Sequence, residues 1–363
     1  MIAETSNPLL EQALSAKLRR KDRSAGHLGK LEPVAIRLGL LQNSLKPGFV
    51  DPQLVLFAAD HGLAVDGIHT VQSQATDEVS LGLLEGRLPL ALFARQMGFA
   101  LSIVDCGMAS RLHGHERLLQ RKIAHGTRNT RLGSAMSLDQ AHASIRAGME
   151  IGDALPGNLL ACAGIGVASH EVAAMVLSRL TEVPARELLS SGPDMNPDLL
   201  AHLLAVAHSA QTRHRDVVDP VEVLAAFGGF ETGVMVGAML VAASKRHLIL
   251  VDGITACAAL MVASRISAPV TDYCVFCRSS SHHGLDQALA QFHASSLLDL
   301  GMDTTDGTGA CLAFPLVSAA AALLTDSPDA GDSAPRVPTD FAPTAIASPG
   351  YDALAPTRPD DLG

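Results

Sequence analysis

Aromatic side chains are scarce in this sequence of 363 residues: they make up 3% of it, with no tryptophan and two tyrosines. Proteins that bind single-stranded nucleic acid stack the bases on aromatic side chains. The composition therefore argues against that class of protein. Because 48% of the residues are nevertheless hydrophobic, the chain can build a large core from alanine, leucine, valine and isoleucine, which excludes disorder throughout.

Positive charge is also in short supply. Lysine and arginine number 27 against 37 aspartates and glutamates, which gives a formal net charge of −10. A negative field repels the phosphates of nucleic acids and the headgroups of anionic membranes at long range. We therefore expect small molecules or other proteins as partners, and neither nucleic acid nor a membrane.

Cysteine is too infrequent for a disulfide scaffold, and most of its six residues lie in apolar runs that are typical of buried free thiols. The N-terminus lacks an apolar segment next to a small-residue cleavage site, and we find no charge-free run of about 18 apolar residues elsewhere. These features predict a cytoplasmic protein. Cys274 and Cys277 form a CxxC pair without a second pair at zinc spacing, so no metal site is expected there.

The chain divides into three parts by composition. Residues 1–50 carry leucines at helical spacing and predict a helical N-terminal portion that belongs to a smaller domain. Residues 51–325 alternate between short β-rich apolar runs and longer helical stretches, which is typical of βαβ units and a mostly parallel sheet. Residues 326–363 are rich in proline, alanine, aspartate and serine, and predict a mobile tail.

The alternation within residues 51–325 defines the expected elements. The predicted strands lie in LVLFAADHG, ALSIVDCG, NLLACAGIG, HLILVDG and VTDYCVF, and the predicted helices span 76–97, 137–148, 170–180, 231–243 and 284–295. The fold class is therefore α/β, a mostly parallel sheet covered by helices, with a smaller helical part. Ligands of such sheets bind at the carboxyl ends of the strands, which here carry Asp60-His61-Gly62, Asp105, Gly164-Ile165-Gly166 and Asp252-Gly253.

Three glycine-containing motifs are candidates for chemistry, and each has a second interpretation. Gly164-Ile165-Gly166 opens a helix after a strand, where backbone N–H groups can bind a phosphate, but such glycines also serve tight turns without a ligand. Asp306, before Gly307-Thr308-Gly309, suits a general base or a helix N-cap. Gly228-Gly229-Phe230-Glu231 begins a helix, and close packing accounts for it as well as ligand binding does.

Eight segments between residues 25 and 325 recur in one order in a known family: LGKLE, FAADHGLAVDGI, KIAHGTRN, AMS, GIG, AAFGGFETG, LVDGITACAAL and DGTGA. Together they resemble the nicotinate-nucleotide:dimethylbenzimidazole phosphoribosyltransferase family. The resemblance implies a Rossmann-like sheet with helices on both faces, a homodimer, and a reaction without metal or cofactor. That reaction transfers ribose 5-phosphate from nicotinate mononucleotide to an azole base such as 5,6-dimethylbenzimidazole, and yields an α-riboside phosphate for the lower ligand of cobamides (vitamin B12).

The resemblance also implies roles for individual residues. Asp306 stands where the family has a glutamate base, and it is one methylene shorter; a retraction of about 1.5 Å costs around a hundredfold in rate unless the backbone moves. Cys162 replaces a glutamate of the acceptor pocket, and Glu78 could supply that carboxylate instead. By position, the donor and phosphate residues are Gly164, Gly166, Ser169, Gly229, Glu231, Ser280, His282, Gly307 and Thr308, and the acceptor residues are Thr70, Glu78, Cys162 and Thr304.

Three functions stay open, because the glycines and apolar runs match the family while many polar residues differ, and a fold does not carry function with it. The first is phosphoribosyl transfer with Asp306 as base. The second is a catalytically altered paralogue that binds nucleotide or azole as a regulatory or scaffold partner, which the loss of the family's phosphate-binding lysine favours. The third is transfer to another acceptor, such as a phenol or a different azole, or from another donor.

Overall fold

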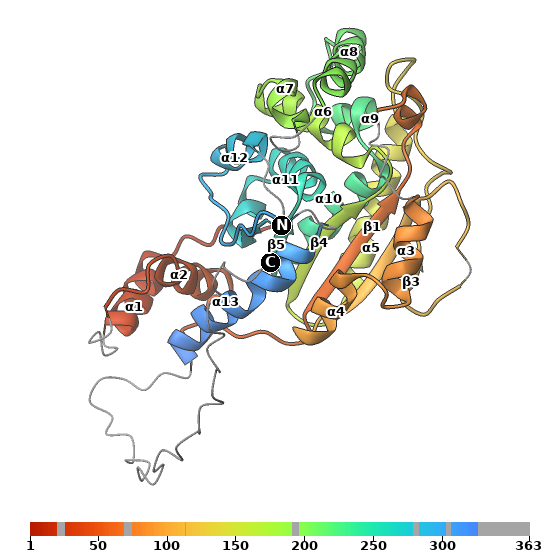
Figure 1. Cartoon of the computed structure of the whole chain (residues 1–363). Helices are drawn as coiled ribbons and strands as arrows, with labels where there is room; N and C mark the ends of the chain where they lie inside the picture. Colours follow the sequence, from red (N-terminus) through yellow and green to blue (C-terminus); the bar gives the residue numbers. More distant parts are fainter. Residues whose placement is uncertain are drawn as a thin grey trace, which may run out of the picture.

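A six-stranded parallel sheet forms the centre of the molecule (Figure 1). The computed structural model describes residues 1–19, 26–68, 75–112, 114–190, 196–278, 283–302 and 306–325, so the predicted tail lies outside the described residues. The strands are β1 (Gln53–Ala59), β2 (Ala100–Gly107), β3 (Leu118–Gln120), β4 (Leu159–Ile165), β5 (Leu248–Asp252) and β6 (Cys274–Cys277). The α/β class predicted from the sequence is confirmed.

The strand order is β3-β2-β1-β4-β5-β6, and every neighbouring pair is parallel. The chain therefore adds β2 and β3 on one side of β1 and then returns to add β4, β5 and β6 on the other side. In a doubly wound sheet this reversal leaves a crevice outside the carboxyl ends of the two central strands, here β1 and β4. All residues of β1, β4, β5 and β6 are buried, as expected for parallel strands covered on both faces.

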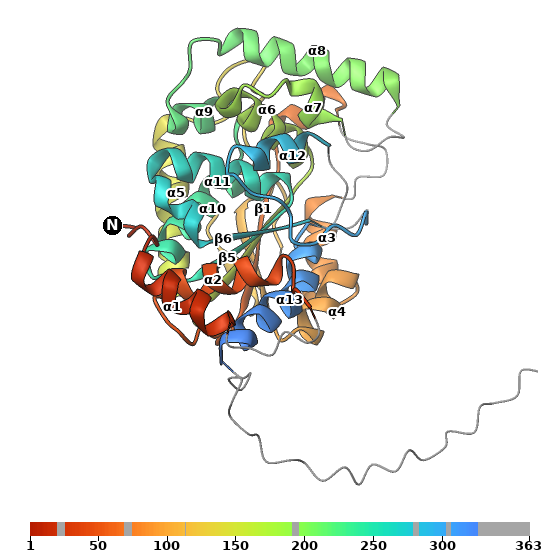
Figure 2. The ribbon, with the colours of Figure 1, turned by 90° about the vertical axis from the view of Figure 1, so that its left-hand side faces the viewer.

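Helices cover both faces of the sheet. One face packs against α10 (Phe230–Ser244) and α11 (Ile254–Ile266), with α5 (Leu138–Ala154) packed on α10, and the other against α3 (Thr76–Leu84), α4 (Pro89–Gln96) and α13 (Thr308–Thr325). The predicted helical N-terminal portion consists of α1 (Pro8–Arg19) and α2 (Leu31–Leu41), which lie against α13 (Figure 2). The remaining helices are α6 (Ser169–Thr181), α7 (Ala185–Leu189), α8 (Pro197–Arg213), α9 (Pro220–Phe227) and α12 (His283–Ala290), with 3-10 turns η1 (Gly62–Asp66) and η2 (Ala268–Tyr273).

Two expectations from the sequence were wrong. Residues 76–97 form two helices, α3 and α4, because Gly86 takes a positive φ of 75° and Pro89 begins the second helix. A charge-free apolar run does exist: α13 is long and apolar enough to cross a membrane by length and composition. Half of α13 is buried within the fold, however, where it packs against α2 and α4, as the core helix of a globular domain does.

Helices α5 and α10 approach each other so closely that their backbones touch. A Cβ atom on Gly148 of α5 would lie 1.8 Å from the carbonyl oxygen of Val234, and one on Gly237 of α10 would lie 1.9 Å from the carbonyl oxygen of Ile145. Both distances are far below van der Waals contact, so only glycine fits at these positions. This contact fixes the position of α10 relative to α5.

We expect Gly148→Ala to lower the free energy of unfolding by at least about 2 kcal/mol, because the added methyl group must push α10 off α5. Chemical denaturation followed by circular dichroism measures this effect. Gly133→Ala is the matched control, since a Cβ at Gly133 meets no atom within 4 Å. Equal stability of the two variants would contradict the backbone contact.

Candidate active site

A buried ion pair joins three elements at the carboxyl ends of β1 and β4. His61 follows β1, and its Nε2 lies 3.1 Å from Oε1 of Glu231, in the first turn of α10. The Nδ1 atom of His61 lies 2.7 Å from the carbonyl oxygen of Val167, in the loop after β4. Both side chains of the pair are fully buried. A histidine and a carboxyl group therefore link α10 to the loops at the carboxyl ends of β1 and β4.

The hydrogen-bond partners define the protons of this pair. The Val167 carbonyl oxygen only accepts, so Nδ1 of His61 donates to it. Thr232 donates its hydroxyl to the same Glu231 oxygen at 3.0 Å, which favours a carboxylate that also accepts from Nε2. Burial lowers the pKa of His61, but the charge of Glu231 and the hydrogen bonds to Glu231 and Val167 outweigh it and raise the pKa above 6.5. The raised pKa favours the protonated form of His61, whose Nε2 faces Glu231.

A second chain of hydrogen bonds ties the same loops to α3. Thr76, the first residue of α3, donates its hydroxyl to the Asp60 carboxylate and accepts the backbone N–H of Val167 at 3.1 Å. The other Asp60 oxygen accepts the backbone N–H of Ala109 at 2.7 Å. The loops after β1, β2 and β4 are therefore held in one arrangement.

The glycines of two predicted motifs are required by close packing. A Cβ on Gly166 would lie 1.9 Å from the carbonyl oxygen of Ala59, and one on Gly164 would lie 2.4 Å from a methyl group of Thr255. A Cβ on Gly229 would lie 2.1 Å from the Glu231 carboxylate and 2.4 Å from the His61 ring. Packing therefore accounts for these glycines whether or not a ligand binds beside them.

The proposed base, Asp306, lies at the end of β5. Its carboxylate packs over Gly253, where a Cβ would lie 2.0 Å from Oδ2, and its side chain is partly buried. Asp252, the last residue of β5, is fully buried and accepts the backbone N–H of Gly307 at 2.7 Å. Burial, and after it the charge of Asp252, raise the pKa of Asp306 well above 3.8. A carboxyl group with such a pKa is suited to proton transfer near neutral pH.

Of the remaining predicted site residues, some lie at the carboxyl edge of the sheet, one is exposed, and four lie outside the described residues. Ser169 begins α6 beside the loop after β4, and Gly307 and the buried Thr308 begin α13 next to Asp306. Glu78 is exposed in the first turn of α3. The other predicted residues, Thr70, Ser280, His282 and Thr304, lie outside the described residues. All these roles stay predictions.

Cys162 lies inside β4 and is fully buried. Burial, with a small contribution from Cys274, raises the pKa of its thiol well above the usual 9.0, so Cys162 is a neutral, apolar side chain. Its predicted contact with the acceptor stays untested. No group of three or more histidine, cysteine, aspartate or glutamate side chains that could hold a metal ion occurs within the described ranges.

Sequence reasoning did not assign roles to His61 or Asp252. Both follow the apolar core of a strand directly, in Asp60-His61-Gly62 and Asp252-Gly253. Their position at strand ends was the available signal, but a single sequence does not show that His61 meets Glu231 across 170 residues or that Asp252 meets Gly307 across 55 residues.

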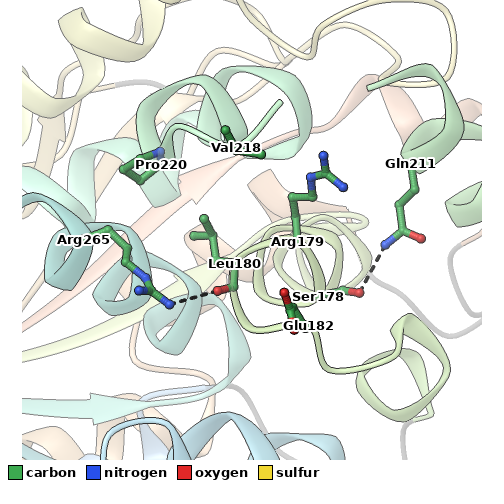
Figure 3. Close-up of a pocket in the computed structure, with 8 residues that line it drawn as sticks. All are labelled: Ser178, Arg179, Leu180, Glu182, Gln211, Val218, Pro220 and Arg265. Atoms are coloured by element: carbon green, nitrogen blue, oxygen red, sulfur yellow. Dashed lines mark hydrogen bonds between the residues drawn. The ribbon is translucent and has the colours of Figure 1, made fainter. Parts of the chain in front are cut away.

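A cavity in the described part of the molecule lies elsewhere. It has a volume of about 470 Å³ and is lined by the last turn of α6 and by residues including Gln211 and Arg265 (Figure 3). Arg265 donates to the carbonyl oxygen of Leu180, and Gln211 donates to the Ser178 hydroxyl. Ser178 is nine residues from Ser169, or about 14 Å along the helix axis. This cavity is therefore separate from the carboxyl edge of the sheet.

Comparison with known proteins defines first the class and then the family. A family model described as phosphoribosyltransferase matches residues 3–333. The chain is 36% identical to the nicotinate-nucleotide–dimethylbenzimidazole phosphoribosyltransferase of Janthinobacterium sp. (strain Marseille), over 89% of this chain and 94% of that protein. It is 39% identical to the protein of the same name from Cupriavidus taiwanensis, over 87% and 92%. The chain therefore belongs to the nicotinate-nucleotide:dimethylbenzimidazole phosphoribosyltransferase family, and the resemblance seen in the sequence is confirmed.

Solved structures agree with this assignment. The nicotinate-nucleotide–dimethylbenzimidazole phosphoribosyltransferase of Thermus thermophilus superposes with a TM-score of 0.80 at 28% identity, over 88% of this chain and 96% of that chain. A structure titled CobT from the same organism gives a TM-score of 0.82 at 28% identity, over 87% and 96%. The Rossmann-like architecture expected from the resemblance is confirmed.

The raised pKa of His61 makes stability depend on pH in a defined direction. The folded protein holds the His61 proton more tightly than the unfolded chain does. The contribution of His61 to the free energy of unfolding is therefore complete below pH 6.5 and is lost as the pH rises through the folded-state pKa. We expect Glu231→Gln to lower the free energy of unfolding by about 1 to 3 kcal/mol at pH 6, and by less at pH 8. Thermal unfolding at a series of pH values measures the difference.

Glu222→Gln is the control for this measurement, because Glu222 occupies the first turn of α9 and is exposed. It is expected to change stability little at any pH. A loss in Glu231→Gln of the same size at pH 6 and pH 8 would contradict the ionised pair.

Proposed function

We propose that this protein transfers ribose 5-phosphate from nicotinate mononucleotide to an azole base such as 5,6-dimethylbenzimidazole. The product is the α-riboside phosphate from which the lower ligand of cobamides is assembled. Family membership supports the proposal, and one observation carries it: Asp306, in the position of the base, is partly accessible and its pKa is raised. A homodimer in the cytoplasm belongs to the same proposal, and six free, buried cysteines suit a reducing compartment.

The reaction requires one proton transfer and one substitution. Asp306 removes the N–H proton of the azole, and the lone pair of the other ring nitrogen attacks the anomeric carbon of the ribose. The bond from that carbon to the nicotinate nitrogen breaks, its electron pair stays on nicotinate, and the configuration changes from β to α. A raised pKa makes Asp306 a stronger proton acceptor in this step.

The donor phosphate has a natural place at the start of α6. Ser169 is the first residue of that helix, which begins in the crevice between β1 and β4. The positive end of the helix dipole favours an anion there. We place Gly164, Gly166 and Ser169 on the donor side, and Asp306 with Gly307 on the acceptor side.

Binding without transfer is the second candidate function. Cys162 is buried and neutral. The family resemblance implies a glutamate of the acceptor pocket at this position. A paralogue that binds nucleotide or azole would tolerate this change. Incubation with nicotinate mononucleotide and a panel of dimethylbenzimidazole, benzimidazole, adenine and phenols, analysed by mass spectrometry, separates the candidates. Release of nicotinate with a riboside phosphate of any acceptor establishes transfer, whereas calorimetric binding without product supports the paralogue.

We expect Asp306→Asn to lower kcat by at least about a hundredfold, because the amide accepts no proton from the azole. The affinity for nicotinate mononucleotide, measured by calorimetry, should stay within about threefold, since the base acts on the acceptor. In the unsubstituted protein the rate should rise with pH as Asp306 loses its proton, at a pH above 3.8.

Asp216→Asn is the control, because Asp216 has a side-chain exposure of 91%. Its kinetics should match those of the unsubstituted protein. Turnover retained in Asp306→Asn would remove Asp306 from the role of base.

A further inference from the structure

Asp252 is a buried carboxyl residue that has no role in the reaction described above. It ends β5, is fully buried, and one of its carboxylate oxygens accepts the backbone N–H groups of Gly307 at 2.7 Å and Ala310 at 3.2 Å. The first N–H groups of a helix have no partner within the helix. Asp252 therefore supplies the hydrogen bonds that fix the first turn of α13 (Thr308–Thr325).

The same contact fixes the residue just before that turn. Asp306 is adjacent to Gly307, and its carboxylate occupies the space above Gly253, the neighbour of Asp252. Gly253 has a φ of +86° and Gly307 a φ of +99°, conformations that side chains rarely adopt. Two positive-φ glycines thus let the chain bring two carboxylates together at the end of β5.

We propose that Asp252 is the positioning residue of the base: it holds the Asp306 loop in place and, through its negative charge, strengthens Asp306 as a proton acceptor. The inference rests on the proposed function, because Asp306 is taken as the base. Asp252 itself touches neither substrate in this scheme and acts through Asp306.

Among the described residues, Asp252 is the charged neighbour that raises the pKa of Asp306. Burial and then Asp252 raise the pKa of Asp306. The thiols around the two carboxylates come from α11, β6 and α13, and burial raises the pKa of each, so all three are neutral near pH 7; they are Cys257, Cys277 and Cys311. Arg278, after β6, is paired with Asp286 at 2.7 Å and with Asp299.

A stronger proton acceptor has a defined kinetic signature. The negative charge of Asp252 holds a proton on Asp306 up to a higher pH, so activity begins at a higher pH, while the ionised base takes the azole proton more readily. Removing only that charge should therefore shift the acidic limb of the pH–rate profile to lower pH and lower the plateau.

Asp252→Asn makes this change while keeping an oxygen that accepts from Gly307 and Ala310. We expect the acidic limb of kcat/KM to move down by about one pH unit and the plateau of kcat to fall by about tenfold. A lower rate with an unshifted limb would show a purely structural role and overturn the inference.

Asp105→Asn is the matched control. Asp105 lies near the carboxyl end of β2, is equally buried, and accepts the backbone N–H of Met108 at 3.0 Å. It pairs with Lys122 at 3.1 Å and is not among the causes of the Asp306 shift. Its substitution is expected to leave the acidic limb in place, and a similar shift in this control would also overturn the inference.

A measurement without turnover separates this inference from the proposed function. Because the pKa of Asp306 is raised, the folded state loses stability as the pH rises from 3.8 through the folded-state pKa. Asp306→Asn should therefore gain melting temperature, relative to the unsubstituted protein, as the pH rises. In the Asp252→Asn background this gain should be smaller, and an equal gain overturns the inference even if no transfer is detected.

A titration of the unsubstituted protein keeps the test valid if Asp252→Asn does not fold. The 13C signal of the Asp306 carboxyl group, assigned by its loss in Asp306→Asn, should titrate above the usual aspartate range and report a second, coupled step. Titration as a single step near 3.8 would overturn the inference. Retained turnover in Asp306→Asn, by contrast, would overturn the base assignment itself.

Discussion

The buried contact between His61 and Glu231 is the interaction on which the geometry of the site depends. Two opposite charges lie out of water, and such a pair persists only when its hydrogen bonds are good. His61 uses both ring nitrogens, one toward α10 and one toward the loop after β4. The glycine before Glu231 leaves the space that the carboxylate and the ring fill. The loops at the carboxyl ends of β1 and β4 are therefore held together by a contact among three separate parts of the chain.

Much of the sheet could be predicted from the sequence because local pattern and burial coincide there. Each of the strands β1, β2, β4, β5 and β6 overlaps a predicted apolar run, and only Gln53 and Cys277 lie one residue outside. β3 is an edge strand of three residues next to β2. Three residues are too few to give a periodic sequence pattern. Helix α8 was missed although Pro197 and the Asn196 cap mark its start, which is a signal the sequence did contain.

The site residues could be predicted only where a local sequence pattern, such as a glycine-rich loop, indicates them. Asp306 could be recognised from its glycine-rich loop, and the structure places it at the carboxyl edge as expected. The glycines at 164, 166 and 229 were recognised too, but contacts from distant residues give each a packing role, and no local pattern shows such contacts. The burial of Cys162 could not be predicted for the same reason, because its neighbours come from other strands.

The two carboxylates at this edge of the sheet meet opposite electrostatic surroundings. Glu231 contacts the His61 ring and accepts the Thr232 hydroxyl, and these two contacts fix its position. Burial of Asp306 and the nearby carboxylate of Asp252 both favour its protonated form. A carboxyl group whose pKa is raised is the better candidate for accepting a proton in catalysis. This contrast supports the proposal that Asp306, rather than the more deeply buried Glu231, is the proton acceptor.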